Sequence, residues 1–337
     1  MTKKFKPFAT TPLSTQGRTS STPMLSCQRR LASIVCPEIW MPAFAGMTNI
    51  RAYFALITLI NSSPALAIDV AYVDKDLSQN PITAAAFTNA VEEKLALMAQ
   101  PMAIPRPKET KTSELKVRAV HNGSWIAFQL NWLAKEKSEA GKLGTFSDAV
   151  AVQFPVLDNK APPPIFMGVQ GNPVHIYHWR AQYQKDRDQG MRSMKDIYPH
   201  MHVDNYPLEF SDKVQLNGLN DANREVFVTG LAAGNAQSFQ KVKGFDEIIA
   251  EGFGSSSVID NTEGLADGSW VNGEWSVVIA RPLKRLKGSV LEAGASSFTA
   301  FAVWQGSEGE VGSRKSVTMN WVPIKLAALP SSKLEQN

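Results

Sequence analysis

The chain has 337 residues, of which 44% are hydrophobic and 20% charged, and its formal net charge at pH 7 is +4. The positive excess belongs to the N-terminal part, because residues 1–67 hold seven Lys and Arg and one acidic residue. The rest of the chain has 28 basic and 30 acidic residues, a net charge of −2, which argues against nucleic-acid binding. Both cysteines, Cys27 and Cys36, also precede residue 68, so the later part can form no disulfide and no thiolate metal site.

The first predicted element is a secretory signal peptide over residues 47–67. A single positive charge precedes an apolar run from Tyr53 to Ile60, and an Ala-Leu-Ala sequence follows as a small-x-small cleavage site. The apolar run is too short to span a bilayer, and no later segment is a candidate membrane span. We therefore expect export to the periplasm, with Met47 as the true start and residues 1–46 as a non-native leader.

Residues 68–330 are predicted to form one domain, followed by a tail over residues 331–337. Helical periodicity is scarce in this region. The best helical candidate is residues 82–100, and residues 245–253 are expected to hold a short turn.

Two hairpins give the strongest strand signals. Residues 114–132 form two alternating runs joined by Asn122-Gly123, and residues 268–283 turn in the same way at Asn272-Gly273. In the first hairpin, alternation places four large apolar side chains on one face of the second arm: Ile126, Phe128, Leu130 and Trp132.

Further strands are expected over residues 148–156, 173–182, 296–306 and 315–326. Many short strands separated by Gly, Pro and Asn predict an all-β fold, an antiparallel β-sandwich with long loops and a few short helices. Residues from about 185 to 245 are polar and aperiodic. We interpret them as a long excursion over the sandwich that contacts partners.

The segment "PPPIFMG" raises a question about Met167. The prolines restrict the backbone before this methionine, and Gly168 permits a tight turn or the close approach of a flat ligand. A thioether is a soft ligand for haem iron and favours its reduced form. The alternative is that Met167 fills the core, as methionines among prolines and aromatics usually do.

Eight segments in this order resemble the haem-b-binding γ subunit of ethylbenzene-dehydrogenase-type molybdoenzymes, in the type II dimethyl-sulfoxide-reductase family. The resemblance covers approximately residues 80–326. Its segments are "KVRAVHNGSWIAFQLNW", "FSDAVAVQFP", "PIFMG", "VHIYHWRAQ", "IIAEGFGS", "GSWVNGEWSVVIARPL", "FTAFAVWQG" and "RKSVTMNW".

This resemblance implies a β-sandwich that holds one non-covalent haem b through an axial methionine and an axial lysine. The methionine matches Met167, and the lysine matches Lys315. A lysine ligates only after losing its proton, which burial in an apolar pocket favours. Arg314 and Arg281 are candidates to pair with the haem propionates, with solvated arginines as the alternative. The chain contains no Cys-x-x-Cys-His, which excludes covalent c-type haem.

The same resemblance implies an electron relay rather than an enzyme. Its partners would be a molybdopterin catalytic subunit, an iron–sulfur subunit and a soluble c-type cytochrome. Two filled axial positions leave no open position for a substrate. The sequence also has no Gly-x-Ser-x-Gly, phosphate loop or nucleotide fingerprint. A carrier that acts without molybdenum partners is the alternative.

The histidines offer other metal sites. His175 and His178 are three residues apart on a predicted strand, so they point to opposite faces and cannot easily share a metal. Either could replace lysine as the second axial ligand. His200 and His202, with Asp204, could hold copper or zinc, but we expect a metal-free loop there.

Seven tryptophans of this region support two interpretations. As core residues they line the sandwich, and as exposed platforms they would stack on sugar rings. Their places within regular strands favour the core. A haem-free carbohydrate-binding module is therefore the alternative function. These residues are Trp125, Trp132, Trp179, Trp270, Trp275, Trp304 and Trp321.

Overall fold

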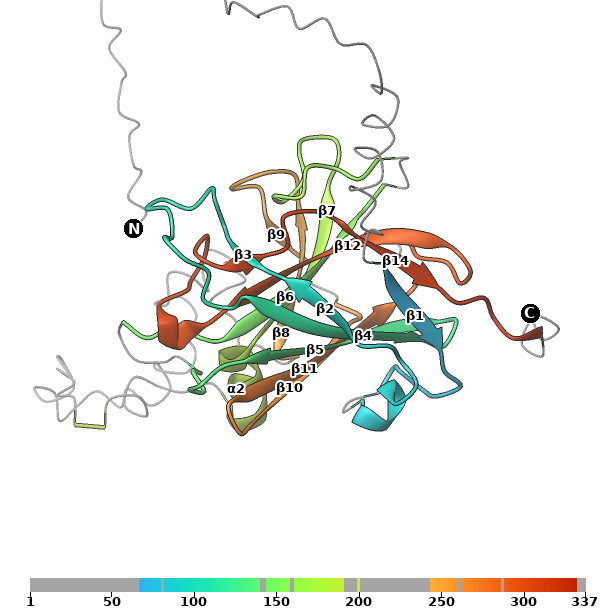
Figure 1. Ribbon diagram of the computed structural model, residues 1–337, viewed down its shortest axis with the longest axis horizontal. Coiled ribbons are helices and arrows are strands. Elements are labelled where there is room, and N and C mark those ends of the chain that lie inside the picture. The colour runs from blue at the N-terminus through green and yellow to red at the C-terminus, as the bar shows by residue number, and fades with distance from the viewer. Residues whose placement is uncertain are drawn as a thin grey trace, which may run out of the picture. The chain divides into compact units, whose positions relative to one another are not determined.

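A computed structural model of the chain describes residues 67–79, 82–139, 144–157, 161–190, 199–200, 243–259, 262–285 and 288–331 (Figure 1). These residues form an all-β fold with few helical turns, as the sequence predicts. None of the helices in these ranges has the length and hydrophobicity needed to cross a bilayer. The predicted leader and all of the predicted signal peptide except Ala67 lie outside the described residues.

Six strands form the first layer in the order β10-β11-β5-β4-β1-β14, and β2 pairs with β4 (Figure 1). Their bounds are β1 (Ile68–Tyr72), β2 (Glu93–Ala96), β4 (Glu114–His121), β5 (Trp125–Leu133), β10 (Leu265–Val271), β11 (Glu274–Pro282) and β14 (Val322–Leu326).

The second layer has the strand order β12-β6-β7-β8-β9, with β13 on β12 and β3 on β13. Strand β12 belongs to both layers, because residues 296–299 pair with β14 and residues 300–304 pair with β6. The bounds are β3 (Met98–Ala99), β6 (Ala149–Pro155), β7 (Val174–Arg180), β8 (Phe245–Ala250), β9 (Ser257–Val258), β12 (Ser296–Trp304) and β13 (Ser316–Val317).

The sandwich is not purely antiparallel. Strand β1 pairs in parallel with both β14 and β4, while the other strand pairs are antiparallel among the described residues. Strand β1 lies between β14 and β4. Parallel pairing requires a connection longer than a hairpin loop, and the segments between β1 and each of these strands are long enough.

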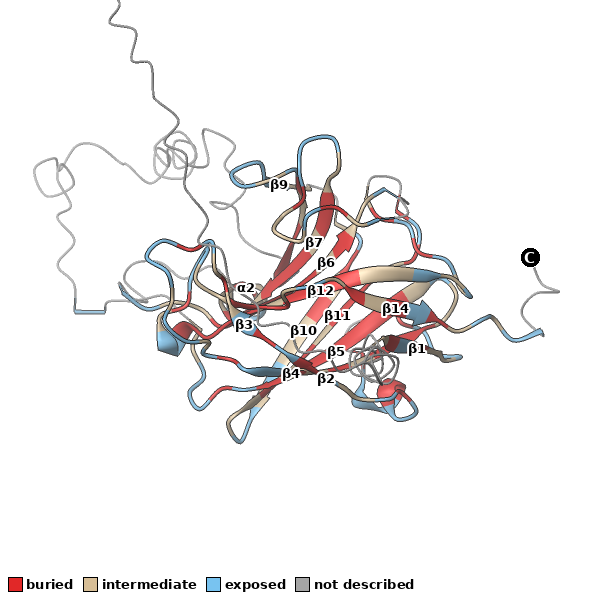
Figure 2. Ribbon diagram, turned by 45° about the horizontal axis from the view of Figure 1, so that its top comes forward, coloured by how far each residue is buried: buried red, intermediate tan, exposed pale blue. Residues whose placement is uncertain are grey.

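The main core lies between the two layers, and its buried residues follow the strands of both (Figure 2). The apolar face predicted for β5 is confirmed, because all four of its side chains are buried in this core. Three tryptophans from three strands meet there. The ring of Trp275 lies 5.0 Å from that of Trp179 and 6.1 Å from that of Trp132.

Only one of the two predicted two-residue turns is confirmed. Asn272 and Gly273 have φ angles of 52° and 83°, as a two-residue hairpin turn of this kind requires. In the first hairpin, the Oδ1 of Asn122 accepts hydrogen bonds from the backbone N–H groups of Ser124 and Trp125. The N–H of Asn122 also donates to the carbonyl of Trp125 at 3.0 Å, so Gly123 and Ser124 form the turn, one residue later than predicted.

Two helical predictions and the end of one predicted strand differ from the structure. Residues 82–100 hold only the 3₁₀ turn η1 (Ala84–Phe87) before β2 and β3, because pairing with distant strands overrides local helix propensity. Residues 245–250 form strand β8, and the short turn expected within residues 245–253 begins only after this strand. Helix α2 (Ala181–Gln189) follows β7 directly, whereas we expected the strand to reach Gln182. Helix α2 is polar and buries only two side chains, so its sequence carries no helical apolar stripe.

The other predicted segments agree in part. Residues 315–326 form two strands, β13 and β14, instead of one, and a second 3₁₀ turn, η4 (Gly306–Glu308), follows β12. The excursion predicted from about 185 to 245 begins inside α2, and most of it lies outside the described residues.

Candidate ligand cavity

A cavity of about 720 Å³ lies on the outer face of the second layer, away from the main core. Strand alternation separates the two surfaces. Along β6, Val150 and Val152 face the core, whereas Ala149, Ala151 and Gln153 line the cavity. The volume lies within the range of sites that bind small molecules and cofactors.

Small side chains make the floor of this cavity. Ala151 of β6 pairs with Ala302 of β12 on one side and with His178 of β7 on the other. Ala149 and Ala300 also line the floor. Because alanine side chains extend only a short distance from a sheet, this part of the cavity has a broad apolar surface without large side chains. Such a surface suits a flat apolar ligand.

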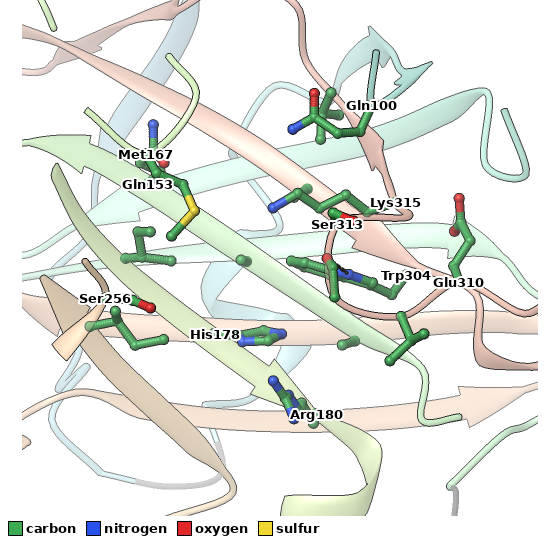
Figure 3. A pocket seen from close by; sticks show the side chains of 18 of the residues that line it. Gln100, Gln153, Met167, His178, Arg180, Ser256, Trp304, Glu310, Ser313 and Lys315 are labelled. Atoms are coloured by element: carbon green, nitrogen blue, oxygen red, sulfur yellow. Dashed lines mark hydrogen bonds between the residues drawn. The ribbon is translucent and has the colours of Figure 1, made fainter. Parts of the chain in front are cut away.

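Met167 reaches the cavity from a strained turn. Its φ angle is 67°, which non-glycine residues rarely adopt. Its backbone N–H donates to the carbonyl of Ile165 at 3.0 Å, and its carbonyl accepts from the N–H of Gly252 at 2.7 Å. Figure 3 shows its thioether pointing into the cavity. Backbone strain of this kind concentrates at functional sites.

Gly168 shapes this turn without lining the cavity. Its φ angle is 72°, and a Cβ atom added there would lie 2.8 Å from the carbonyl oxygen of Asn172 and 3.2 Å from that of Ala250. Glycine is therefore required by the packing of the backbone. Of the two reasons proposed for this glycine, the structure supports the tight turn.

Lys315 enters the same cavity just before β13, and its side chain points toward Met167 in Figure 3. Its amine lies 4.7 Å from the centroid of the Trp304 ring. Among the described residues the amine has no hydrogen-bond or ion-pair partner. Burial lowers the pKa of Lys315 to about 8, because nothing compensates the loss of water around the charge. The neutral, ligating form of the amine is thus accessible near neutral pH.

The two arginines predicted from sequence do not line the cavity. Arg281 lies in the core between the layers, where its guanidinium donates to Ser289 and to the carbonyl of Leu283 and packs 5.0 Å from the Phe154 ring. Arg314 stands beside the cavity, 5.9 Å from the ring of Phe146, which is a wall residue. The structure thus brings Met167 and Lys315 together and leaves both arginines outside.

The two histidines of β7 point to opposite faces, as predicted. His175 is buried in the core, with its Nε2 2.8 Å from Oε1 of Glu247. His178 lines the cavity, and its ring stacks on Trp304 with centroids 4.7 Å apart. His178 is therefore the only one of the pair that could reach a ligand in the cavity.

Of the other predicted metal cluster, only His200 belongs to the described residues. His202 and Asp204 lie outside the described residues. Elsewhere in the described ranges, no group of three His, Cys, Asp or Glu side chains is arranged to hold a metal ion.

The sequence analysis did not identify several polar residues of the cavity, among them Arg180, Gln100 and Glu310. Arg180 continues the alternation of β7 after His178, which could have identified it. Gln100 is 5% exposed and its Oε1 has no hydrogen-bond partner within the described structure. Glu310 accepts hydrogen bonds from the N–H of Gln305 and the hydroxyl of Ser316, and burial raises its pKa. No local pattern marks Gln100 or Glu310.

The tryptophans mainly serve packing. Trp132, Trp179 and Trp275 belong to the core, and Trp304 forms a buried wall of the cavity. These four are not exposed platforms for sugar rings. Trp321 donates from its Nε1 to the carbonyl of Pro163 at 2.7 Å, which fastens the proline run that precedes the Met167 turn.

Fold and site together define a β-sandwich protein with a ligand cavity on the outer face of one layer. Residues 82–316, from η1 to β13, match the family described as ethylbenzene dehydrogenase, and the chain belongs to this family. The resemblance inferred from the sequence segments is thereby confirmed.

Two relatives are similar over most of the chain. The first, from Haloferax mediterranei, is named "Putative respiratory nitrate reductase heme subunit ORF7" and is 23% identical over 265 residues, 77% of this chain and 73% of that protein. The second, the chlorate reductase subunit gamma of Ideonella dechloratans, is 26% identical over 218 residues. That match covers 64% of this chain and 65% of the relative, just under two thirds of its length.

Solved structures offer a weaker likeness. A family 9 carbohydrate binding module from Caldicellulosiruptor kristjanssonii, in complex with glucose, aligns with a TM-score of 0.39 and 8% identity. The alignment covers 79% of this chain and 97% of the module. A likeness at this level does not bear on function.

Proposed function

We propose that this protein is an electron-transfer subunit that holds one haem b, with Met167 and Lys315 as the axial ligands of the iron. The observation that carries the proposal is that a thioether and an unpaired amine enter one cavity in a member of the ethylbenzene dehydrogenase family. The names of the two relatives, a heme subunit and a gamma subunit of reductases, support it.

The residues present fit a haem. The alanine floor provides a broad apolar surface, and the cavity is large enough for a cofactor. The lowered pKa of Lys315 makes the neutral amine available, as ligation requires. Bound haem would supply a one-electron carrier at this site.

Each side chain has a distinct role in this proposal. Met167 offers a soft sulfur that favours reduced iron, and its strained turn holds the sulfur in place before a ligand arrives. Trp304 packs against the Lys315 amine and gives it an aromatic neighbour in the cavity. With both axial positions taken by protein groups, the chain itself would catalyse no substrate chemistry.

The wider setting is also part of the proposal. The partners would be the iron–sulfur and molybdopterin subunits of an oxidoreductase complex, with a soluble c-type cytochrome at the other end of the relay. The sequence pattern of residues 47–67 supports a periplasmic location.

The test is a reduced-minus-oxidised optical spectrum of the exported protein, produced with haem supplied. We expect a low-spin b-type spectrum that becomes high-spin or disappears in Met167→Ala and in Lys315→Ala. Matched controls are Met102→Ala and Lys325→Ala, which alter exposed residues and should leave the spectrum unchanged.

Two results would contradict this proposal. Folded protein that takes up no haem would overturn the function. A spectrum that changes in Met167→Ala but not in Lys315→Ala would move the second ligand elsewhere, and His178 is then the residue to replace next.

A further inference from the structure

We propose that Arg180 is the anion-binding residue of the cavity and that it pairs with a carboxylate of the bound ligand. The identity of that carboxylate, a haem propionate, rests on the proposed function. The residue replaces Arg281 and Arg314, which do not line the cavity.

The placement of Arg180 follows from strand geometry. It is the last residue of β7 and shares the cavity face with Ile176 and His178. Its partner across the sheet is Ala149 of β6, which has a small side chain and also lines the cavity. In Figure 3 Arg180 lies beyond His178, away from Met167 and Lys315. The cation therefore sits apart from the two candidate axial ligands.

The guanidinium of Arg180 is held in position by Tyr183 of α2. Its Cζ lies 4.8 Å from the centroid of the Tyr183 ring. The ring is buried, and its hydroxyl hydrogen-bonds with Asp246 and also interacts with the guanidinium. An arginine already fixed by a buried ring loses little side-chain entropy when it binds an anion.

The charged residues that line the cavity support the same anion-binding role for Arg180. Arg180 and Lys315 are the two cationic Lys or Arg side chains of the lining, within the part of the chain that the structure describes. The carboxylate of Asp246 hydrogen-bonds with the hydroxyl of Tyr183, which also hydrogen-bonds with the guanidinium of Arg180. The one acidic residue of the described lining, Glu310, already accepts bonds from Gln305 and Ser316. Beyond its contact with Tyr183, Arg180 thus offers a fork-shaped donor that matches a carboxylate.

The surroundings of Arg180 are polar, as a carboxylate site requires. The hydroxyl of Ser147 accepts from the backbone N–H of Gln182 at 3.0 Å, which ties the loop before β6 to the start of α2 beside Arg180. Ser147, Gln182 and Thr145 all line the cavity. The alanine floor would take the apolar body of a ligand and this region its charged groups.

The experiment compares the dissociation constants of ferric haem and of haem dimethyl ester, whose propionates carry no charge. Both are titrated into haem-free wild type, Arg180→Leu and Arg180→Gln, with absorbance and tryptophan fluorescence as readouts. Arg180→Gln keeps a polar side chain beside Tyr183 in case the leucine variant fails to fold. Arg314→Leu is the matched control, because it removes a cation that lies beside the cavity without lining it.

We expect wild type to bind haem at least about 10-fold more tightly than the ester, as one charge-assisted pair allows. Both Arg180 variants should lose this preference through weaker haem binding, with ester binding unchanged. Arg314→Leu should retain it. Full preference in the Arg180 variants would overturn the role of Arg180 and leave the proposed function standing. Folded wild type that binds neither compound would overturn the proposed function, and this assignment with it.

Discussion

The amine of Lys315 lies 4.7 Å from the centre of the Trp304 ring, and the same ring stacks on His178. Trp304 is itself fixed, because its Nε1 donates to the carbonyl of Gly312 at 2.9 Å. One indole therefore contacts both the amine and the imidazole and forms a wall of the cavity beside them. The site depends on this packing residue as well as on the two groups that would bind a ligand.

Replacing Trp304 should affect stability and binding together. Trp304→Ala should lower the free energy of unfolding by about 3–5 kcal/mol, because a large buried ring is lost. Trp304→Phe should lower it by about 1 kcal/mol, the cost of the hydrogen bond to Gly312. Urea denaturation measures both, and haem titration should show weaker binding in each.

Trp270→Phe is the control for the Trp304 variants. Trp270 also donates from its Nε1 to a carbonyl, that of Ala134, but it does not line the cavity. Its replacement should cost a similar amount of stability and leave haem affinity at the wild-type value. Equal effects of Trp270→Phe and Trp304→Phe on haem affinity would contradict the role given to Trp304.

The turn at Met167 can be tested in the haem-free protein. Met167→Val should lower the free energy of unfolding by about 1–2 kcal/mol, because a β-branched side chain is costly at a left-handed φ angle. Met167→Gly should not lower it, since glycine adopts this conformation freely. Thermal or urea unfolding distinguishes the two, and a more stable valine variant would show that the turn is not strained.

Gly168→Ala tests the second half of the turn. The added Cβ would meet the carbonyl oxygens of Asn172 and Ala250, so we expect a loss of about 1–3 kcal/mol in the free energy of unfolding. Gly171→Ala is the control, because it has a similar φ angle of 79° but nothing within 4 Å. Equal losses in the two variants would mean that backbone conformation, and not crowding, explains the glycine at 168.

The hairpins and the buried face of β5 could be predicted because alternation and turn residues are local signals. The helix predicted over residues 82–100 was wrong because the strands found there depend on distant partners. Residues 93–99 form β2 and β3 through pairing with β4 and β13, and neither partner is visible in the local sequence. Met167 and Lys315 came from the family resemblance, since a methionine or lysine alone does not mark a cavity. The alternation of side chains along β7 could have placed Arg180 on the same face as His178. The place of Gln100 in the cavity depends on tertiary packing, which the local sequence does not show.

The alanines that line the cavity allow a test by added volume. Ala151→Leu should fill space in the cavity and weaken haem binding by at least about 10-fold with little loss of stability, because the new side chain projects into empty volume. Ala119→Leu enlarges an alanine of the main core instead and should lower the free energy of unfolding by about 1–3 kcal/mol. Unchanged haem affinity in Ala151→Leu would place the ligand elsewhere.

A pH dependence of stability is expected from His121, which is fully buried at the end of β4. Burial lowers the pKa of this imidazole, so the folded protein keeps it neutral where the unfolded chain takes up a proton. Its contribution to stability is therefore lost as the pH falls below about 6.5, by up to about 1.4 kcal/mol per pH unit.

His121→Phe removes this contribution and keeps a ring beside Tyr72, whose centroid lies 5.7 Å from that of His121. The stability of the variant relative to wild type should rise as the pH falls from 7.5 to 5. Urea unfolding at several pH values measures the difference. A constant difference over this range would show that His121 is protonated equally in both states.

The walls of the cavity come from segments spread between Gln100 and Thr318. No N-terminal fragment of the growing polypeptide holds both the Met167 turn and the strand that follows Lys315 until nearly the whole domain has been synthesised. Strand β12, which joins the two layers, is also among the last to emerge. A ligand that needs both side chains therefore binds only when these two distant segments have come together, and it does not assist the formation of the local hairpins.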